Sequence, residues 1–358
     1  MSKFYPLTVS QKQADTRDAV VLSFAVPASL QAQFHYREGQ HLTLRADIAG
    51  EDVRRSYSIC SAVQDDQLKV AIKRVAGGVF SNWAHDVLQA GATIDVMPAM
   101  GHFSLPTNGI AHKQYLGFAA GSGITPLLSI IKTSLLAEPD SQFTLVYGNR
   151  ASSTVMFKEE LAALKDMFMQ RLKLIYIMSR EQQDIELFNG RINEEKCAAL
   201  FGQWINLSDI DMAFICGPET MMHAVSNSLQ QHGMAKENIR VELFAASIPA
   251  HRHITGVKPL LGKSSCAVTL IMDGQHTHFE MEKDRESVLD AALKLGHEMR
   301  YSCKGGVCST CRSKVVAGKV DMDSNYALED YEVARGFVLT CQSFPVSDTL
   351  TLDFDSEN

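Results

Sequence analysis

The 358-residue sequence lacks any apolar run near the ~20 residues that a membrane-spanning helix needs. Its first five residues, Met-Ser-Lys-Phe-Tyr, also lack the apolar segment of a secretory signal peptide. The first absence argues against a membrane protein, and the second argues against export. We therefore expect a cytoplasmic protein.

A disulfide framework is missing as well. Four of the eight cysteines are scattered along the chain, namely Cys60, Cys197, Cys216 and Cys266. Such a distribution is typical of proteins from reducing compartments. The hydrophobic content of 46% and the charged content of 21% are those of an ordinary globular chain, long enough for two or three domains.

The chain has no excess of positive charge, and its formal net charge is −7. Residues 265–358 hold sixteen acidic and nine basic residues, whereas the first 264 residues carry 25 of each sign. The lack of a basic excess argues against nucleic-acid binding, and the acidic C-terminal segment favours docking to basic patches on redox partners. Simple solvation explains any single one of these charges equally well.

The densest pattern lies in residues 303–311, which read Cys-Lys-Gly-Gly-Val-Cys-Ser-Thr-Cys and are followed, after 29 intervening residues, by one more cysteine. This spacing is that of plant-type 2Fe–2S ferredoxins, and the expected ligands are Cys303, Cys308, Cys311 and Cys341. The two glycines let backbone amides approach the cluster sulfides. A Rieske centre is excluded because the loop has no histidine, and zinc remains the alternative.

Residues 1 to about 106 show short alternating stretches, such as residues 41–44 and 68–73, which predict a small antiparallel barrel. On one of its strands, Arg55, Tyr57 and Ser58 offer what the phosphate, ring and N5 of a flavin need. A turn with Gly77, Gly78 and Ser81 then leads into a helix expected near residues 84–89, where free amides suit a pyrophosphate. An ordinary cross-strand pair of Arg and Tyr is the alternative.

Residues 112 to about 245 alternate between apolar strands and helical stretches. Strands are expected at 115–120, 143–147, 172–178, 212–216 and 239–244, with helices at 127–136, 157–168 and from Gly217-Pro218 to about Gln231. This order predicts a parallel sheet with helices on both faces.

Ligands of such sheets bind at the carboxyl ends of the strands, where two glycine turns fall. The first contains Gly121, Ser122, Gly123 and Thr125, and the second contains Cys216, Gly217 and Pro218. The G-x-G-x-x-G dinucleotide fingerprint is absent, so a plain strand–helix turn is the alternative. Arg150, Ser179 and Arg180 follow two other strands and could bind an adenosine 2′-phosphate, or could be solvated surface residues.

Residues 246–264 lack periodicity and are expected to form a linker, in which His251 and His253 are a solvated pair. The remaining segment begins with strands at 267–272 and 276–281. A helix at 287–295 and the cysteine loop follow, and the segment ends on a strand at 350–354.

Taken together, these motifs resemble the ferredoxin–NADP reductase superfamily, in particular oxygenase reductases with a C-terminal plant-type ferredoxin. The resemblance runs over nearly the whole chain and is carried by residues 39–44, 55–60, 119–126, 143–150, 213–218 and 303–311. It implies a multidomain fold: an FAD-binding antiparallel β-barrel (1–108), an α/β nucleotide domain with a parallel sheet (112–245), the linker, and an α+β ferredoxin domain of the β-grasp type (265–358).

The resemblance also implies the cofactors and their sites. FAD is expected at Arg55, Tyr57, Ser58, Gly78 and Ser81. The pyridine nucleotide is expected at Gly121, Ser122, Gly123, Thr125, Arg150, Gly217 and Pro218. Tyr57, Ser58 and Cys216 are expected at the reacting rings. Ser179 and Arg180 resemble the pair that selects NADPH over NADH.

Electron counting then predicts a function. NADPH gives up two electrons at once, whereas a 2Fe–2S cluster takes one at a time, so a flavin must split the pair. The expected order is NADPH, FAD, cluster and an external acceptor. By resemblance, the acceptor is the oxygenase part of a multicomponent di-iron monooxygenase. The alternatives are a reductase for another oxygenase or for a hybrid cluster protein, and a redox sensor or assembly subunit without turnover.

Overall fold

A computed structural model describes residues 4–106, 113–244, 264–283 and 285–356 of the chain. The chain divides into two compact units, one formed by Tyr5–Leu243 and the other containing everything from Phe244 onward. The expected linker, with His251 and His253, lies outside the described residues except for Ser264.

The first sheet is antiparallel, with the strand order β4-β3-β6-β1-β2-β5. A bridge between Ile59 and Val70 joins the end of β4 to β5, so the sheet curls into a barrel. Alternate residues fill its interior, including Leu42 and Leu44, as the sequence pattern predicts. The strands are β1 (Tyr5–Thr16), β2 (Ala19–Ala25), β3 (His41–Ile48), β4 (Glu51–Ser58), β5 (Leu68–Lys73) and β6 (Thr93–Met100).

Helix α1 (Val79–Asp86) begins about five residues before the helix expected from the sequence. Gly77 has a φ of 72°, which ends the preceding turn, and Gly78 is the N-cap. Phe80 and Ala84, one helical turn apart, are buried against the barrel. The helix therefore starts directly at the glycine turn.

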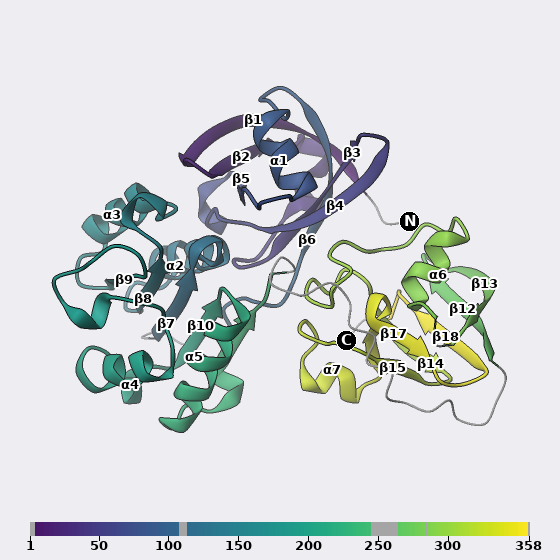
Figure 1. Ribbon diagram of the computed structural model, residues 1–358. Coiled ribbons are helices and arrows are strands. Elements are labelled where there is room, and N and C mark those ends of the chain that lie inside the picture. Colours follow the sequence, from purple (N-terminus) through teal and green to yellow (C-terminus); the bar gives the residue numbers. More distant parts are fainter. Residues whose placement is uncertain (1–3, 107–112, 245–263, 284, 357–358) are drawn as a thin grey trace. The chain divides into compact units, whose positions relative to one another are not determined.

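The second sheet is wholly parallel, as expected, with the order β11-β10-β7-β8-β9 (Figure 1). All five residues of β10 are buried, so helices cover both of its faces. The strands are β7 (Gln114–Ala120), β8 (Gln142–Asn149), β9 (Leu172–Met178), β10 (Met212–Cys216) and β11 (Ile239–Glu242). The helices are α2 (Ile124–Ala137), α3 (Lys158–Met167), α4 (Glu194–Gln203) and α5 (Glu219–Gln231).

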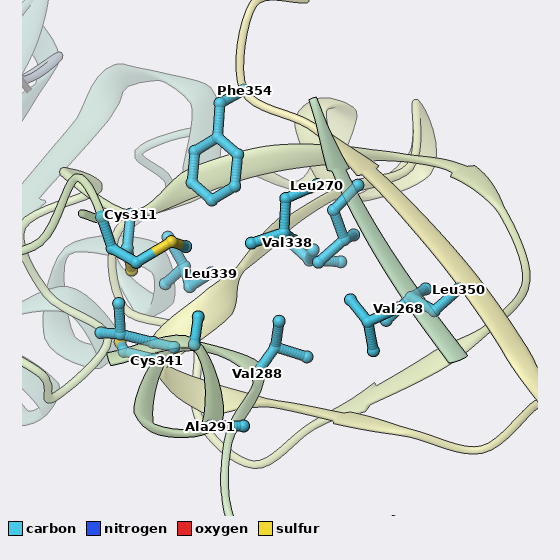
Figure 2. Close-up of a cluster of buried hydrophobic side chains, with 14 of the residues drawn as sticks. Val268, Leu270, Val288, Ala291, Cys311, Val338, Leu339, Cys341, Leu350 and Phe354 are labelled. Atoms are coloured by element: carbon cyan, nitrogen blue, oxygen red, sulfur yellow. The ribbon is translucent and has the colours of Figure 1, made fainter. Parts of the chain in front are cut away.

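The second unit contains a mixed sheet with the order β13-β12-β18-β14-β16, in which β12 and β18 are parallel. Its apolar core includes Val268, Leu339 and Leu350, and it also takes in Cys311 and Cys341 (Figure 2). The elements are β12 (Ser265–Met272), β13 (Gln275–Glu282), α6 (Val288–Lys294), β14 (Arg312–Ala317), β15 (Val320–Met322), α7 (Asp330–Ala334), β16 (Phe337–Leu339), β17 (Ser343–Pro345) and β18 (Thr349–Asp353). The predicted combination of barrel, parallel sheet and ferredoxin-like domain is confirmed.

Short 3-10 helices connect these elements, at Ala28–Phe34, Val63–Asp65, Gly121–Gly123, Ser152–Thr154, Glu186–Phe188, Leu207–Asp209, Lys236–Asn238 and Thr340–Gln342. Among the described residues, no helix has both the length and the apolar composition for crossing a bilayer.

Candidate functional site

Strand β4 presents the residues expected at a flavin. Arg55 and Tyr57 are two positions apart and so share a face, and Arg55 is exposed. The Tyr57 ring lies 5.7 Å from the Phe80 ring, which packs in turn 5.4 Å from Trp83. Burial raises the pKa of Tyr57, so its hydroxyl stays protonated at neutral pH. The strand thus offers an aromatic face beside a cation.

The turn after β5 is held open at the N-terminus of α1. Ser81 Oγ accepts a hydrogen bond from the Val75 amide at 3.1 Å, and Asn82 Nδ2 donates to the Gly78 carbonyl at 2.6 Å. A Cβ atom on Gly78 would lie 2.7 Å from Ser81 Oγ, so a larger residue there would displace this hydroxyl. Ser81 is buried inside the turn, where it shapes the backbone at the start of α1.

The two glycine turns of the parallel sheet meet at its switch point. Strand β8 lies on one side of β7 and β10 lies on the other, so the order of the strands reverses beside β7. Parallel sheets bind ligands at such a reversal. A Cβ atom on Gly123 would lie 2.1 Å from the Cys216 carbonyl oxygen, so the turns are in direct contact. Tyr147 donates to the Gly121 carbonyl at 2.9 Å and so fixes the first turn.

Within the first turn, Thr125 Oγ1 donates to the Ser122 carbonyl at 3.0 Å, at the start of α2. Gly121 has a φ of 54°, and a Cβ there would lie 3.7 Å from Lys73 Nζ. A cation therefore lies beside the turn, and sequence reasoning did not single it out. In the second turn, Gly217 is buried and Pro218 is the exposed N-cap of α5.

A carboxyl group that sequence reasoning missed joins two of the predicted residues. Glu242 is paired in register with Cys216, and its Oε2 accepts a hydrogen bond from Ser58 Oγ at 3.0 Å and lies 4.0 Å from Cys216 Sγ. Burial raises the pKa of Glu242 to about 8, although the Ser58 hydrogen bond lowers it. Burial also raises the pKa of Cys216, so the thiol stays neutral.

The flavin strand and the nucleotide sheet thus meet at one hydroxyl, one thiol and one carboxyl. Only the strand register brings Glu242 to this place, because it lies 184 residues from Ser58. The signal in the sequence was a carboxylate at the end of the last strand of the sheet, next to another strand that ends on a cysteine.

Three arginines follow the carboxyl ends of β8 and β9. The Arg180 amide donates to the Arg150 carbonyl at 2.8 Å, and the Ser179 amide donates to the Asn149 carbonyl at 2.9 Å. The Gly190 amide donates to Met178 at 2.8 Å, which brings Arg191 to the same edge. All three arginines are exposed, and in the described part of the chain their guanidinium groups have no hydrogen-bond partner.

The edge also carries a buried donor. The Asn149 side chain is buried and interacts with the Tyr147 hydroxyl. The exposed arginines at this edge fit an anionic nucleotide. Arg191 was missed because it lies in a segment without periodicity, after a glycine.

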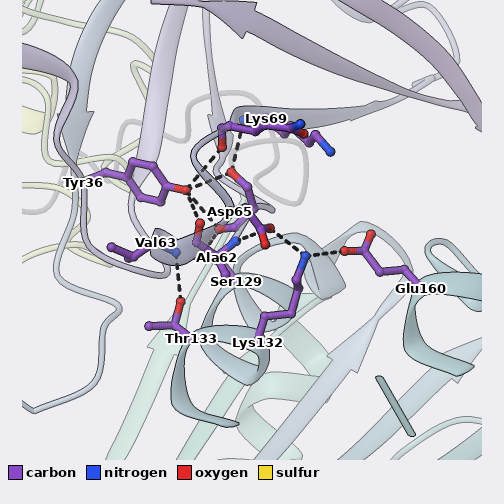
Figure 3. Close-up of polar contacts among 11 residues, drawn as sticks. Tyr36, Ala62, Val63, Asp65, Lys69, Ser129, Lys132, Thr133 and Glu160 are labelled. Atoms are coloured by element: carbon purple, nitrogen blue, oxygen red, sulfur yellow. Dashed lines mark hydrogen bonds and ion pairs between the residues drawn. The ribbon is translucent and has the colours of Figure 1, made fainter. Parts of the chain in front are cut away.

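Polar contacts fasten the barrel to helix α2 within the first unit (Figure 3). Lys132 Nζ lies 2.6 Å from Asp65 Oδ2 and 2.7 Å from Glu160 Oε1. Ser129 Oγ donates to the Ser61 carbonyl at 2.6 Å. Because the segment around Asp65 follows β4 and α2 begins at the glycine turn, these contacts hold the two cofactor regions together.

In the second unit, the four predicted ligands lie close together. The Gly305 amide lies 3.3 Å from Cys303 Sγ, and the Cys303 amide lies 3.5 Å from Cys308 Sγ. Hydrogen bonds from Cys308 and Cys341 lower the pKa of Cys303 well below its usual value, whereas the thiols that donate have raised pKa values. The neighbouring thiols thus favour the thiolate form at Cys303 alone, and thiolate is the form that binds iron.

Burial and one glycine shape this cage. Cys308, Cys311 and Cys341 are buried, and Cys303 is partly exposed. Gly306 has a φ of 76°, and a Cβ there would lie 2.9 Å from the Ser324 carbonyl oxygen. The loop therefore needs glycine to close around its ligand. Within the described ranges, no three His, Cys, Asp or Glu side chains converge as the ligands of a single ion do.

Comparison with known families agrees with this arrangement. An oxidoreductase FAD-binding domain matches residues 6–105, an oxidoreductase NAD-binding domain matches 118–227, and a 2Fe–2S iron–sulfur cluster binding domain matches 270–346. FAD, a pyridine nucleotide and a 2Fe–2S cluster are thus the cofactors of the chain, as expected.

Curated relatives cover the whole chain. A component of the 1,2-phenylacetyl-CoA epoxidase of Escherichia coli (strain K12) is 44% identical over 100% of this chain and 99% of its own length. A 3-ketosteroid-9-alpha-monooxygenase ferredoxin reductase component of Rhodococcus rhodochrous is 34% identical over 97% of this chain and 96% of its own. The sequence also suggests the reductase component of the ring-1,2-phenylacetyl-CoA epoxidase, and this resemblance is confirmed.

Solved structures show the same fold at low identity. Phthalate dioxygenase reductase aligns with a TM-score of 0.59 and 22% identity, covering 98% of both chains. An intact type IV self-sufficient cytochrome P450 monooxygenase aligns with a TM-score of 0.68 and 22% identity over 98% of this chain, which spans 41% of that protein. The chain belongs to the family of multicomponent oxygenase reductases within the ferredoxin reductase superfamily, oxidoreductases with FAD-binding, NAD-binding and C-terminal 2Fe–2S domains.

Proposed function

We propose that this chain is an NADPH-dependent reductase that supplies electrons to the di-iron oxygenase subunits of a phenylacetyl-CoA epoxidase, in phenylacetate breakdown. The observation that carries the acceptor is the 44% identity to a component of such an epoxidase over the full chain. FAD supplies the conversion of an electron pair into single electrons, and the cluster passes these to the oxygenase.

The barrel residues hold and orient the flavin. Arg55 is exposed beside the Tyr57 ring and pairs with a phosphate, while the Tyr57 ring covers the isoalloxazine face. The turn at Gly78 and Ser81 offers amides at the start of α1 to the pyrophosphate. Ser58 lies at the end of β4 and presents a hydroxyl to the reacting edge.

The switch point holds the nucleotide. Gly121, Ser122, Gly123 and Thr125 would hold its pyrophosphate at the start of α2, and Cys216, Gly217 and Pro218 would hold its nicotinamide. Glu242, neutral below a pKa of about 8, keeps net charge away from Cys216 and Ser58.

Selection of NADPH over NADH rests on the arginines at the β8 and β9 ends. The edge holds Arg150, Ser179 and Arg180, and Arg191 lies there as well. Together these side chains suit a 2′-phosphate. A guanidinium group binds phosphate through two parallel hydrogen bonds, which NADH cannot use.

Cys303, Cys308, Cys311 and Cys341 are the cluster ligands in this proposal. We place the protein in the cytoplasm, because its cysteines are unpaired and thiolate ligands persist in a reducing compartment.

The test is reconstitution. The purified protein should show flavin and 2Fe–2S absorption and should support NADPH-dependent epoxidation of phenylacetyl-CoA when mixed with the cognate oxygenase. NADPH-to-dye activity without support of that oxygenase would point to another acceptor, such as a steroid monooxygenase, since a relative of that kind is 34% identical. A protein that reduces neither would favour the sensor.

Nucleotide choice is tested separately. Arg180→Ala and Arg191→Ala should each raise KM for NADPH at least tenfold and leave KM for NADH within about twofold, since a lost charged hydrogen bond is worth about 1.5–3 kcal/mol. Arg17→Ala, on the connection between β1 and β2, is the control and should change neither value. Equal effects on both nucleotides would remove these arginines from the 2′-phosphate site.

A further inference from the structure

One side chain connects the fourth cluster ligand to the loop that holds the other three. Gln342 directly follows Cys341 and is 6% exposed. Its Nε2 donates to the Lys304 carbonyl at 3.0 Å and to the Cys341 carbonyl at 2.9 Å, which joins segments 38 residues apart. The same nitrogen lies 3.7 Å from Cys341 Sγ. The amide is thus a side-chain donor within hydrogen-bond reach of this sulfur.

The surroundings fix the orientation of this amide. A Cβ atom on Gly306 would lie 3.1 Å from Gln342 Cγ, so the ligand loop presses against the side chain. The Asp323 amide donates to the Gln342 carbonyl at 3.0 Å and holds its backbone. The amide nitrogen has two N–H groups and three acceptors: one N–H faces the Lys304 carbonyl, and the other is shared between the carbonyl and Sγ of Cys341.

The donor to Cys341 differs in kind from the donors to the other ligands. Cys303 and Cys308 receive backbone amides, from Gly305 and Cys303 respectively. At Cys341 the donor is a side chain, which a substitution can remove while every residue of the 303–311 loop stays the same.

We propose that Gln342 sets the reduction potential of the 2Fe–2S cluster by donating its amide N–H to the Cys341 thiolate. Reduction adds negative charge to the cluster, and a hydrogen bond to a ligand sulfur stabilises that charge and raises the potential. A thiolate accepts more strongly than the neutral thiol, so the bond strengthens when iron is bound. The inference rests on the proposed cluster ligation. Through this hydrogen bond, Gln342 sets how electrons are distributed at equilibrium between the flavin and the cluster.

The test is a redox titration of the full-length Gln342→Met variant, followed by EPR of the reduced cluster. Methionine has a similar length and no N–H, and it fills space beside a hollow of about 540 Å³ that Cys341 and Gln342 both line. The flavin–cluster equilibrium should move at least threefold toward the flavin. At 59 mV per tenfold for one electron, this is a fall of about 30 mV in cluster potential.

The Fe–S(Cys) stretching frequencies in the resonance Raman spectrum should rise as well, because the sulfur then gives more charge to iron. Ser343→Ala is the matched control: Ser343 is buried next in sequence, and its Oγ donates to the Leu339 carbonyl at 2.8 Å rather than to a sulfur. This control should leave the potential unchanged. A fully loaded Gln342→Met protein with the parent potential would overturn the proposal.

A second measurement needs no variant. In wild-type protein labelled with 15N in glutamine side chains, pulsed EPR of the reduced cluster should show coupling to one amide nitrogen. Its absence would overturn the proposal even if the methionine variant failed to take up iron. Wild-type protein without 2Fe–2S absorption would instead refute the proposed function, and this inference with it.

Discussion

Glu242 combines burial, a hydroxyl partner and a thiol neighbour at the place where the two cofactor regions meet. Its pKa of about 8 keeps the carboxyl neutral at pH 7. Above about pH 8 the carboxyl loses its proton, and a negative charge appears beside Cys216. The carboxylate then accepts a stronger hydrogen bond from the Ser58 hydroxyl.

We expect the rate of flavin reduction by NADPH to be flat below pH 8 and to fall above it, measured by stopped-flow absorbance. Glu242→Gln should abolish the fall in rate above pH 8. Glu219→Gln, in the first turn of α5, is the control and should keep it. A descending limb near pH 8 that persists in Glu242→Gln would show that another group titrates.

The same raised pKa links stability to pH. Between the unfolded value of 4.5 and about 8, the folded chain binds the proton and the unfolded chain does not. The contribution of Glu242 to stability is complete below pH 4.5 and is lost as the pH rises through about 8. The thermal midpoint should therefore fall over this range less steeply in Glu242→Gln than in the parent.

At the residue scale, the candidate site residues that sit in local patterns could be proposed from the sequence. The cysteine spacing and the glycine turns after apolar strands are of this kind, because neighbouring residues define them. Glu242, Arg191 and Lys73 could not be found in this way. Their places depend on strand register and on loops far away in the sequence.

At the scale of elements, the contact between the two glycine turns is the tightest constraint at the switch point. Gly123→Ala would push a methyl group to 2.1 Å from the Cys216 carbonyl oxygen. The turns must then separate, which moves both the nucleotide loop and the Cys216 segment.

We expect Gly123→Ala to lose at least tenfold in NADPH-to-dye kcat/KM while FAD and cluster absorption stay at parent levels. Gly202→Ala, at a helical glycine with open space around its Cβ, is the matched control and should be silent. A fully active Gly123→Ala enzyme would mean that the two turns are further apart in solution than they are in the structure.

Helix α2 carries a second constraint through Lys132. Lys132→Met would leave Asp65 and Glu160 without their shared cation. We expect a loss of about 2 kcal/mol in unfolding free energy, below the ~3–5 kcal/mol of a fully buried pair because Glu160 is 39% exposed.

The same variant should show a larger kinetic isotope effect with deuterated NADPH, since the two rings would meet less closely. Lys113→Met, which breaks an ion pair with Asp211 inside the nucleotide sheet, is the control for lost charge. If both variants changed the isotope effect alike, Lys132 would not be specific to the joint between barrel and sheet.

Most elements could be predicted from periodicity, including the parallel strands and the amphipathic helices. The early start of α1 could not, because Gly77 and Gly78 read equally well as part of a longer loop. The joint of Lys132, Asp65 and Glu160 left no sequence signal, since charged residues at these spacings also suit a solvated surface.

At the scale of the whole molecule, the acidic excess lies entirely in the cluster-bearing segment, with sixteen acidic and nine basic residues after position 264. Electron transfer to a basic acceptor such as cytochrome c should slow at least about fivefold between about 0.05 and 0.5 M salt, because salt screens the attraction between the two surfaces. NADPH-to-ferricyanide turnover through the flavin is the control and should change much less. Equal salt dependence would place the acidic segment away from the docking surface.

Division of labour between the two units gives a last prediction. Cys308→Ser should lose the 2Fe–2S spectrum and acceptor reduction, because one ligand of four is replaced by a poorer one. NADPH-to-dye activity should stay within about twofold of the parent, since the flavin and nucleotide residues all lie in Tyr5–Leu243. Loss of both activities would mean that the flavin unit depends on the cluster unit.

The contacts of Lys132 and Ser129 with the barrel also limit how such reductases can be recombined. Polar contacts join the barrel to the nucleotide sheet, so a chimera that takes its barrel from one parent and its sheet from another would separate Lys132 from Asp65 and Ser129 from the Ser61 carbonyl. Exchanging residues 5–243 as one cassette keeps every one of these partners. Donor specificity is therefore inherited as a two-domain block, and laboratory recombination should cut outside it.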